Sequence, residues 1–233
     1  MDILALFSNK EFLLRIAVLV ALLVIGYLTV FRAASKAVLS RKPVGEYVIL
    51  YGPSSSGKTA LFYQLKTGQF KETVSSLKQN KCVITLTRSD EDVSSMEVVD
   101  YPGHEKLRQG LVKLLDRAKL IVFMIDPSDK AGLKDGAEKL FDLLSNEKLS
   151  APVLLVLSKS DKANQKSLKY LMTELEREIE RMRKSKDGED GRFLGIDGKV
   201  FSFDQSPVPV KFTSCSAKTD DLHNLKKEIL TIE

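Results

Sequence analysis

Cysteine is scarce in this chain of 233 residues, and its spacing matches no known disulfide or metal-binding pattern. Cys82 and Cys215 lie far apart, and no C-x-x-C motif is present. Disulfide frameworks and cysteine-ligated metal sites are therefore poor interpretations, and a reducing compartment is favoured. No internal repeat is found. The hydrophobic fraction of 43% excludes a mainly disordered chain, and the charged fraction of 29% excludes a protein that crosses the membrane many times.

The excess of positive charge, +5 in all, is concentrated in the N-terminal segment. Residues 1–42 contain six basic and two acidic side chains, whereas residues 43–233 carry a net charge of only +1. The larger part of the chain therefore lacks the strong basic balance of a nucleic-acid-binding domain. We expect no direct contact with nucleic acid, and any contact with a ribonucleoprotein should be made through a partner.

One long apolar run is present near the N-terminus. Residues 12–31 read FLLRIAVLVALLVIGYLTVF, and a helix of this length spans roughly 30 Å, the thickness of the hydrocarbon core of a bilayer. A cleaved signal peptide is the alternative, but the run is long and no small-x-small cleavage site follows it. More basic residues follow the run than precede it, so the larger part of the chain should face the cytosol.

These observations predict four consecutive parts. They are a short lumenal N-terminus at 1–11, a single transmembrane helix at 12–31 in contact with lipid, a basic linker at 32–45 and a globular domain at 46–233.

From residue 47 onward, apolar strand-like runs alternate with amphipathic stretches, which is typical of an α/β domain. Strands are expected at Tyr47–Tyr51, Cys82–Thr87, Met96–Asp100, Leu120–Asp126, Val153–Ser158 and Val210–Ser214. Helices are expected at Lys58–Lys66, Glu105–Leu115, Lys134–Leu144, Lys166–Arg183 and Leu222–Leu230. The fold class predicted is a six-stranded, mostly parallel sheet with helices on both faces.

Two hairpins interrupt the alternation of strands and helices. Only a polar turn separates the second expected strand from the third, so these strands should pair antiparallel. A further small hairpin is expected at Arg192–Phe203, around the turn-forming residues Asp197 and Gly198.

Residues 52–59 read GPSSSGKT and match the phosphate-binding motif G-x-x-x-x-G-K-[ST]. The motif follows an apolar strand and precedes an amphipathic helix, which is the context it requires. In such a loop, backbone N–H groups bind the phosphates, the lysine neutralises β- and γ-phosphate oxygens, and the hydroxyl binds Mg²⁺. The predicted phosphate loop consists of Gly52, Pro53, Ser54, Ser55, Ser56, Gly57, Lys58 and Thr59.

Three further motifs follow strand ends, where ligands bind an open α/β sheet. Asp100 can hold the Mg²⁺ shell, and the backbone N–H of Gly103 can reach a γ-phosphate. In Ser158-Lys159-Ser160-Asp161, the carboxylate of Asp161 can accept two hydrogen bonds that guanine offers and adenine does not, while the stem of Lys159 covers the ring. Near Ser216, Ala217 and Lys218, a backbone N–H can reach guanine O6.

In this order, the four motifs resemble those of the P-loop small GTPases. Residues 52–59 resemble the phosphate loop, 100–103 the second switch, 158–161 the N-K-x-D guanine motif and 216–218 the S-A-K loop. Ser158 replaces the Asn of N-K-x-D, and the shorter side chain loses part of the contact between this loop and the phosphate loop. The resemblance covers residues 46–233 and is to the Arf-like branch.

Within that branch, the chain resembles the beta subunits of the signal recognition particle receptor. The stretches that carry this narrower resemblance are DYPGHEKLR at 100–108, LKTG at 65–68 and residues 201–218. The resemblance implies GTP and Mg²⁺ as cofactors, a heterodimer with the receptor alpha subunit, and a single-pass position in the endoplasmic reticulum membrane with the GTPase domain in the cytosol. It also implies proximity to the ribosome or translocon, and control of partner binding by the GTP state during co-translational targeting.

Catalysis is expected to be slow. His104 stands at the place of the water-positioning residue, where many small GTPases have Gln, and so is the candidate catalytic residue. The resemblance implies Thr59, Asp100 and a switch hydroxyl as Mg²⁺ ligands; Thr73, Ser75 and Ser76 are the candidates for that hydroxyl, and Ser75 is preferred.

Three alternatives to this function are open. The chain can be an Arf-like trafficking GTPase with a transmembrane anchor, or a constitutively nucleotide-bound scaffold without significant hydrolysis, which His104 and Ser54 favour. An ATP-using P-loop kinase is disfavoured by Asp161.

Overall fold

The computed structural model describes residues 45–74, 76, 78–89, 92–104, 107–162, 166–185 and 193–231. These residues belong to one compact unit, Lys42–Glu233. The predicted transmembrane segment, residues 12–31, lies outside the described residues. Among the helices of the described part, none is both long enough and apolar enough to cross a membrane.

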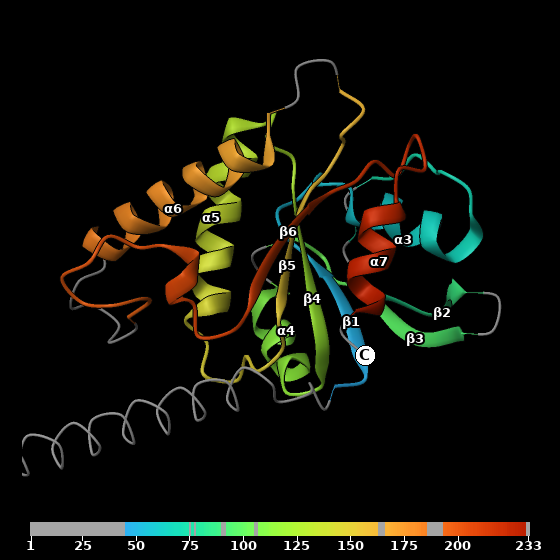
Figure 1. The fold of residues 1–233 in the computed structure, drawn as a ribbon, viewed down its shortest axis with the longest axis horizontal. Coiled ribbons are helices and arrows are strands. Elements are labelled where there is room, and N and C mark those ends of the chain that lie inside the picture. The colour runs from blue at the N-terminus through green and yellow to red at the C-terminus, as the bar shows by residue number, and fades with distance from the viewer. Residues whose placement is uncertain are drawn as a thin grey trace, which may run out of the picture. The chain divides into compact units, whose positions relative to one another are not determined.

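A six-stranded sheet forms the centre of the domain (Figure 1). The strands are β1 Tyr47–Tyr51, β2 Asn80–Ser89, β3 Asp92–Asp100, β4 Ala118–Ile125, β5 Val153–Leu157 and β6 Val210–Ser214. Their order in the sheet is β2-β3-β1-β4-β5-β6. β2 pairs antiparallel with β3, and the other neighbours pair in parallel. The predicted six-stranded, mostly parallel sheet and its first hairpin are confirmed.

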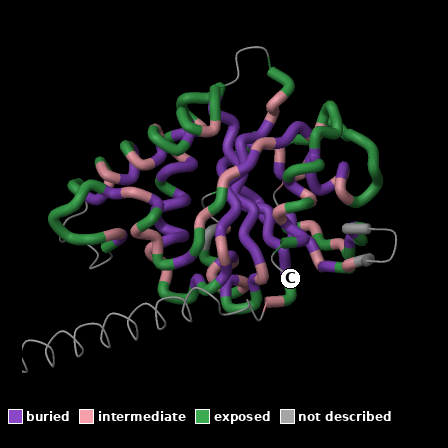
Figure 2. Tube along the Cα trace, viewed as in Figure 1, coloured by how far each residue is buried: buried purple, intermediate pink, exposed green. Residues whose placement is uncertain are grey.

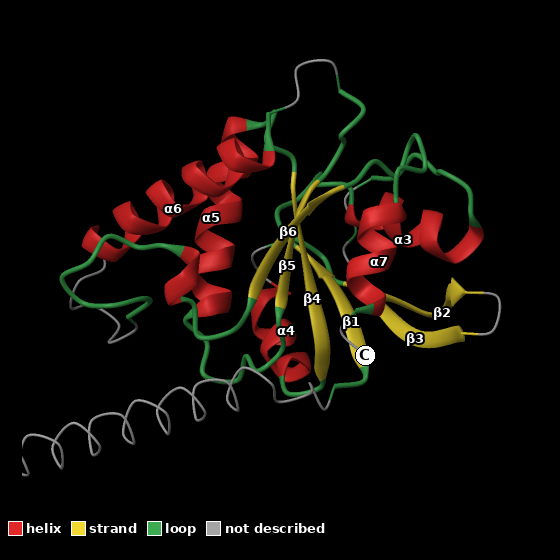
Figure 3. Cartoon of the chain, in the orientation of Figure 1, coloured by secondary structure: helices red, strands yellow, loops and turns green. Residues whose placement is uncertain are grey.

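Helices cover both faces of the sheet, as predicted (Figure 3). Helices α3 (Lys58–Thr67) and α7 (His223–Leu230) pack on one face, where Val48 and Leu50 of β1 point. Helices α4 (Arg108–Leu115), α5 (Lys130–Leu144) and α6 (Leu168–Ser185) pack on the other face, beside Ile49. Alternate residues of the central strands β1, β4 and β5 are thus buried in different cores, and the purple segments of Figure 2 follow these strands.

The second expected hairpin, Arg192–Phe203, is wrong where the structure describes it. Residues 193–202 contain no strand, and the 3-10 helix η2 (Phe203–Gln205) follows them. The segment is held by α6, because the guanidinium of Arg183 donates to the carbonyl oxygens of Ile196 and Lys199, both at 3.0 Å. These contacts satisfy backbone groups that a hairpin would pair with each other.

Candidate functional site

The loop between β1 and α3 is shaped by residues with positive φ. Gly52 has φ of 136°, and a Cβ atom there would lie 2.2 Å from the carbonyl oxygen of Met124 in β4. Gly57, with φ of 90°, is the N-cap of α3. The loop therefore turns tightly onto the start of α3, where unpaired N–H groups and the helix dipole attract anions. This geometry fits the predicted phosphate loop.

Lys58 places a buried ammonium group inside this loop. Its Nζ donates to the carbonyl oxygen of Pro53 at 2.5 Å and to Oγ of Ser56 at 3.2 Å. Burial lowers the pKa of Lys58 to about 8, although the nearby carboxylate of Asp100 opposes this effect. Burial disfavours the charged form of Lys58, and an anionic ligand such as phosphate would stabilise that charged form.

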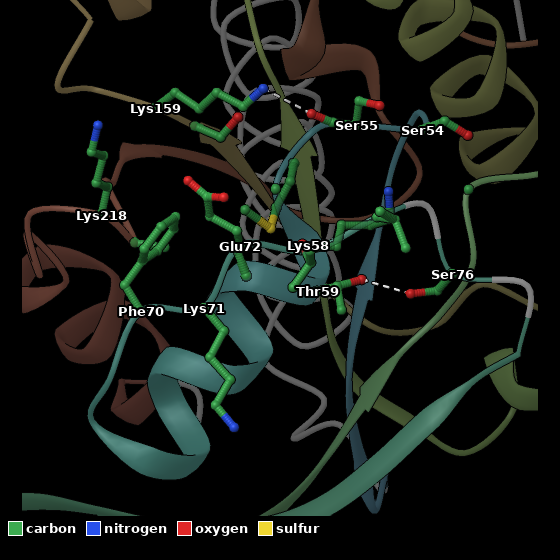
Figure 4. A pocket seen from close by; sticks show the side chains of 18 of the residues that line it. Ser54, Ser55, Lys58, Thr59, Phe70, Lys71, Glu72, Ser76, Lys159 and Lys218 are labelled. Carbon is green, nitrogen blue, oxygen red and sulfur yellow. Dashed lines mark hydrogen bonds between the residues drawn. The ribbon is translucent and has the colours of Figure 1, made fainter.

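Beside Lys58, oxygen atoms cluster around the carboxylate of Asp100. The hydroxyl of Thr59 donates to Asp100 Oδ2 at 2.9 Å and lies 2.9 Å from Oγ of Ser76, as Figure 4 shows for the Thr59–Ser76 pair. Asn80 Nδ2 donates to the same Oδ2 at 3.1 Å. Asp100 is fully buried, yet its Oδ1 has no hydrogen-bond partner. Ser75 lies outside the described residues, so its role as a Mg²⁺ ligand stays a prediction.

The residues around the Asp100 carboxylate fit a magnesium ion. Mg²⁺ prefers carboxylate and hydroxyl oxygens, and it usually takes one or two carboxylates together with phosphate oxygens and water. A buried carboxylate oxygen without a partner is unfavourable by itself, and a cation would satisfy it. Asp100, Thr59 and Ser76 would hold that ion.

Gly103 packs directly against the backbone of the phosphate loop. A Cβ atom at this position would lie 2.5 Å from the carbonyl oxygen of Gly52 and 2.8 Å from the nitrogen of Ser54. The segment after β3 is also joined to β1, because the N–H of Tyr101 donates to the carbonyl oxygen of Leu50 at 3.0 Å. The structure therefore brings the predicted second switch and the phosphate loop together.

The segment after β5 contacts the phosphate loop through Lys159. Its Nζ donates to the carbonyl oxygen of Ser55 at 2.9 Å (Figure 4). Ser158, by contrast, is buried and turns its hydroxyl to the carbonyl oxygen of Ile125 in β4, at 3.0 Å. Ser158 thus does not make the contact that the longer Asn of N-K-x-D would make.

Asp161 is joined to the loop that follows β6. Oγ of Ser216 donates to Asp161 Oδ1 at 2.6 Å, and the N–H of Ser160 donates to the carbonyl oxygen of Cys215 at 3.1 Å. The hydrogen bond from Ser216 lowers the pKa of Asp161. Asp161 is therefore held as a carboxylate, the form that accepts hydrogen bonds from guanine N–H groups.

These strand-end loops enclose a cleft of about 550 Å³, a volume typical of small-molecule and cofactor sites. The predicted residues that line it are Ser54, Ser55, Gly57, Lys58, Thr59, Gly103, Ser158, Lys159, Asp161, Ala217 and Lys218. The lining residues do not include His104, whose side chain is exposed. The lining also does not include the predicted residues Gly52, Pro53, Ser56, Asp100 and Ser216.

Two features of the site were missed in the sequence. Phe70 and Glu72, from the segment between α3 and β2, line the cleft (Figure 4), and an aromatic residue isolated in a polar stretch was the available signal. Asp126, directly after β4, contacts Lys159, with 3.0 Å between Oδ2 and Nζ. Asp100 was predicted because it is a carboxylate at the end of an apolar strand, and Asp126 directly follows another such strand.

The chain is similar in sequence to a group of known proteins. A family model described as "Signal recognition particle receptor beta subunit" matches residues 44–218. The signal recognition particle receptor subunit beta of Mus musculus is 32% identical over 241 residues, which cover 93% of this chain and 87% of the mouse protein.

Solved structures show the same fold. The structure of the mammalian SRP receptor superposes with a TM-score of 0.72 at 33% identity, covering 80% of this chain and 100% of that chain. The signal recognition particle receptor SRb-GTP/SRX complex from Chaetomium thermophilum gives a TM-score of 0.63 at 22% identity, covering 78% of this chain and 96% of that chain. At 22% identity, the comparison with the Chaetomium thermophilum structure shows a similar fold and no more.

Proposed function

Because the chain belongs to the family of signal recognition particle receptor beta subunits, we propose that it binds GTP and Mg²⁺ and, in the GTP state, holds the receptor alpha subunit at the endoplasmic reticulum membrane. The observation that carries this proposal is the convergence of four strand-end loops on one cleft, with a buried ammonium at one end and a carboxylate at the other. Such a cleft matches a nucleotide in both size and charge.

The phosphate end of the cleft suits a nucleoside triphosphate. The N-terminus of α3 and the ammonium of Lys58 supply positive potential for the phosphates. Mg²⁺ held by Asp100 and Thr59 would neutralise charge on the β- and γ-phosphate oxygens. The pKa of Lys58 would rise toward its usual value on phosphate binding, because the anion favours the charged form.

The base end of the cleft suits guanine. Asp161 accepts one hydrogen bond from Ser216 through Oδ1, and a carboxylate has capacity for further N–H donors. Adenine lacks the two adjacent donors of guanine, so its binding would leave this carboxylate without them. Ala217 and Lys218 line the same end of the cleft.

A partner surface lies next to the phosphate end. Val74 is 89% exposed on the segment that also lines the cleft, and Val83 is 69% exposed on the edge strand β2. We propose that these two exposed apolar side chains contribute to the surface that binds the partner. If the γ-phosphate orders the segments around Ser76 and Gly103, it also orders this surface, and partner binding then depends on the nucleotide state.

The membrane anchor in this proposal is residues 12–31. The linker at 32–45 spans at most about 50 Å when extended, which keeps the GTPase domain close to the cytosolic face of the bilayer. Anchoring there would place the alpha subunit near the ribosome or the translocon.

The proposal is tested with the full chain in detergent. Protein loaded with a non-hydrolysable GTP analogue should capture the purified alpha subunit, and protein loaded with GDP should capture much less. Asp161→Asn, incubated with the same GTP analogue, is the matched control and should behave like nucleotide-free protein. Equal capture with GDP and with the analogue would overturn control by the nucleotide state.

A second candidate, a constitutively nucleotide-bound scaffold, is favoured by the position of His104. His104 is exposed and is not among the residues that line the cleft. Single-turnover hydrolysis with and without the alpha subunit separates the two candidates. Turnover that the partner stimulates and that His104→Ala abolishes would contradict the scaffold.

A further inference from the structure

Asp126 directly follows β4 and contacts two lysines that line the cleft. Its side chain is only 8% exposed. Oδ2 lies 2.7 Å from Nζ of Lys162 and 3.0 Å from Nζ of Lys159. Oδ1 accepts hydrogen bonds from the N–H of Ser128 at 3.0 Å and from its hydroxyl at 2.6 Å. Both carboxylate oxygens are therefore occupied, and the direction of the side chain is fixed.

Lys159 connects Asp126 to the phosphate loop of the nucleotide site. The same Nζ that contacts Asp126 donates to the carbonyl oxygen of Ser55 in the phosphate loop. This group therefore joins loops that follow three strands, β1, β4 and β5. Ser158 cannot replace this contact, because its hydroxyl is directed to Ile125 in β4.

The charge state of Asp126 supports this arrangement. Burial raises the pKa of the carboxyl, but hydrogen bonds from Lys162, Ser128 and Lys159 outweigh burial and hold the pKa far below its usual range. Hydrogen bonds between ionised partners are shorter and stronger than neutral ones. Asp126 is thus a permanent counter-charge that fixes a lysine side chain, which has many rotamers when it is free.

We propose that Asp126 is a positioning residue for guanine-nucleotide binding, holding the ammonium of Lys159 against the Ser55 carbonyl so that the base loop and the phosphate loop stay connected. This connection replaces the one that Asn at position 158 would give. The inference rests on the proposed function, because it concerns the same nucleotide site.

The direction of the effect discriminates between two physical explanations. Asp126→Asn removes a negative charge near a site for polyanions, so electrostatics alone would make GTP and GDP bind more tightly. Loss of the connection between the two loops makes them bind more weakly. We expect dissociation constants about tenfold higher for both nucleotides, which equals about 1.4 kcal/mol.

Asp116→Asn is the matched control for this charge change. Asp116 is exposed at the end of α4 and lies 3.9 Å from Lys148 of another surface loop. We expect nucleotide affinity within about twofold of the unaltered chain, since a surface pair of this kind contributes little. All dissociation constants are measured on the full chain in detergent, with folding checked by circular dichroism.

Rescue by Ser158→Asn separates positioning from a general loss of structure. Added to Asp126→Asn, it should restore affinity to within about threefold of the unaltered chain. If Asp126→Asn does not fold, Ser128→Ala removes a hydrogen bond that orients Asp126 and should weaken binding about threefold.

Each outcome bears on one proposal. If Asp126→Asn binds nucleotide as tightly as the unaltered chain or more tightly, or if Ser158→Asn restores nothing, the positioning role is overturned. The same holds if Ser128→Ala is the variant used and its affinity is unchanged. An unaltered chain that binds no guanine nucleotide would overturn the proposed function itself.

Discussion

Replacing Gly103 by Ala tests whether the segment after β3 acts on the phosphate loop. The added methyl group would lie 2.5 Å from the carbonyl oxygen of Gly52, and 2.8 Å from the backbone carbon of Pro53 and the nitrogen of Ser54. Favourable contacts between heavy atoms lie near 3.5–4.0 Å, so one of the two backbones must move by about 1 Å. The neighbours are backbone atoms and cannot adopt another rotamer.

A displacement of this size has a large effect on a preorganised site, where about 1 Å can change a rate or affinity roughly 100-fold. We expect GTP affinity to fall by about 10- to 100-fold, which corresponds to about 1.4–2.7 kcal/mol. GDP should be affected less, because the N–H of Gly103 is predicted to contact the γ-phosphate. Overpacking should also lower the free energy of unfolding by about 1–3 kcal/mol.

The assay is equilibrium binding of fluorescent GTP and GDP, with urea unfolding in parallel. Gly198→Ala is the control, because a Cβ atom there meets nothing within 4 Å and the residue lies in the segment held by α6. That control strains a positive φ of 71° and should lower stability slightly without changing nucleotide affinity. GTP affinity unchanged in Gly103→Ala, or equal losses for GTP and GDP, would refute the reasoning.

Three further predictions concern the base, the phosphate loop and α6. Asp161→Asn should weaken GTP binding at least about 100-fold and improve binding of xanthosine triphosphate, because the C2 oxygen of xanthine accepts a hydrogen bond from the new amide. Competition binding measures both affinities. Unchanged GTP affinity would argue against a guanine contact. The nucleotide-free protein should gain stability as pH rises from about 8 toward 10.5, because the pKa of Lys58 is about 8 in the folded state and the unfolded chain holds the proton more tightly in that window. The gain is at most about 3 kcal/mol by urea unfolding, and it should vanish in Lys58→Met. Arg183→Ala should lower stability by roughly 2–4 kcal/mol, because it removes the two guanidinium hydrogen bonds to the Ile196 and Lys199 carbonyls, while GTP affinity stays unchanged; loss of affinity at full stability would contradict that assignment.

Local pattern was sufficient to predict the sheet and the phosphate loop. The buried strands are short continuous apolar runs, and the loop motif stands between one of them and a helix, so neighbours in sequence determine both features. β2 and β3 are longer than expected, because polar residues next to the turn pair across the hairpin as far as Ser89 and Asp92. Pairing of that kind does not depend on apolar pattern.

The features that sequence reasoning missed depend on contacts between distant segments. The segment after α6 reads like a hairpin, but the buried guanidinium of Arg183 binds its carbonyl groups instead. Gln64 of α3 similarly donates to Asp220 at 2.9 Å, which holds the loop after β6 next to α3. Such pairs have no signature in either segment alone, since each side chain is an ordinary polar residue of a helix or a turn.

Nucleotide selectivity tests the central claim most directly. The full chain in detergent, holding fluorescent GDP, is titrated separately with unlabelled GTP and ATP in the presence of Mg²⁺. With Asp161 held as a carboxylate at the base end of the cleft, GTP should displace the probe at concentrations at least about 1,000-fold lower than ATP. Equal displacement by ATP, or no binding of the fluorescent GDP at all, would contradict a guanine-nucleotide site.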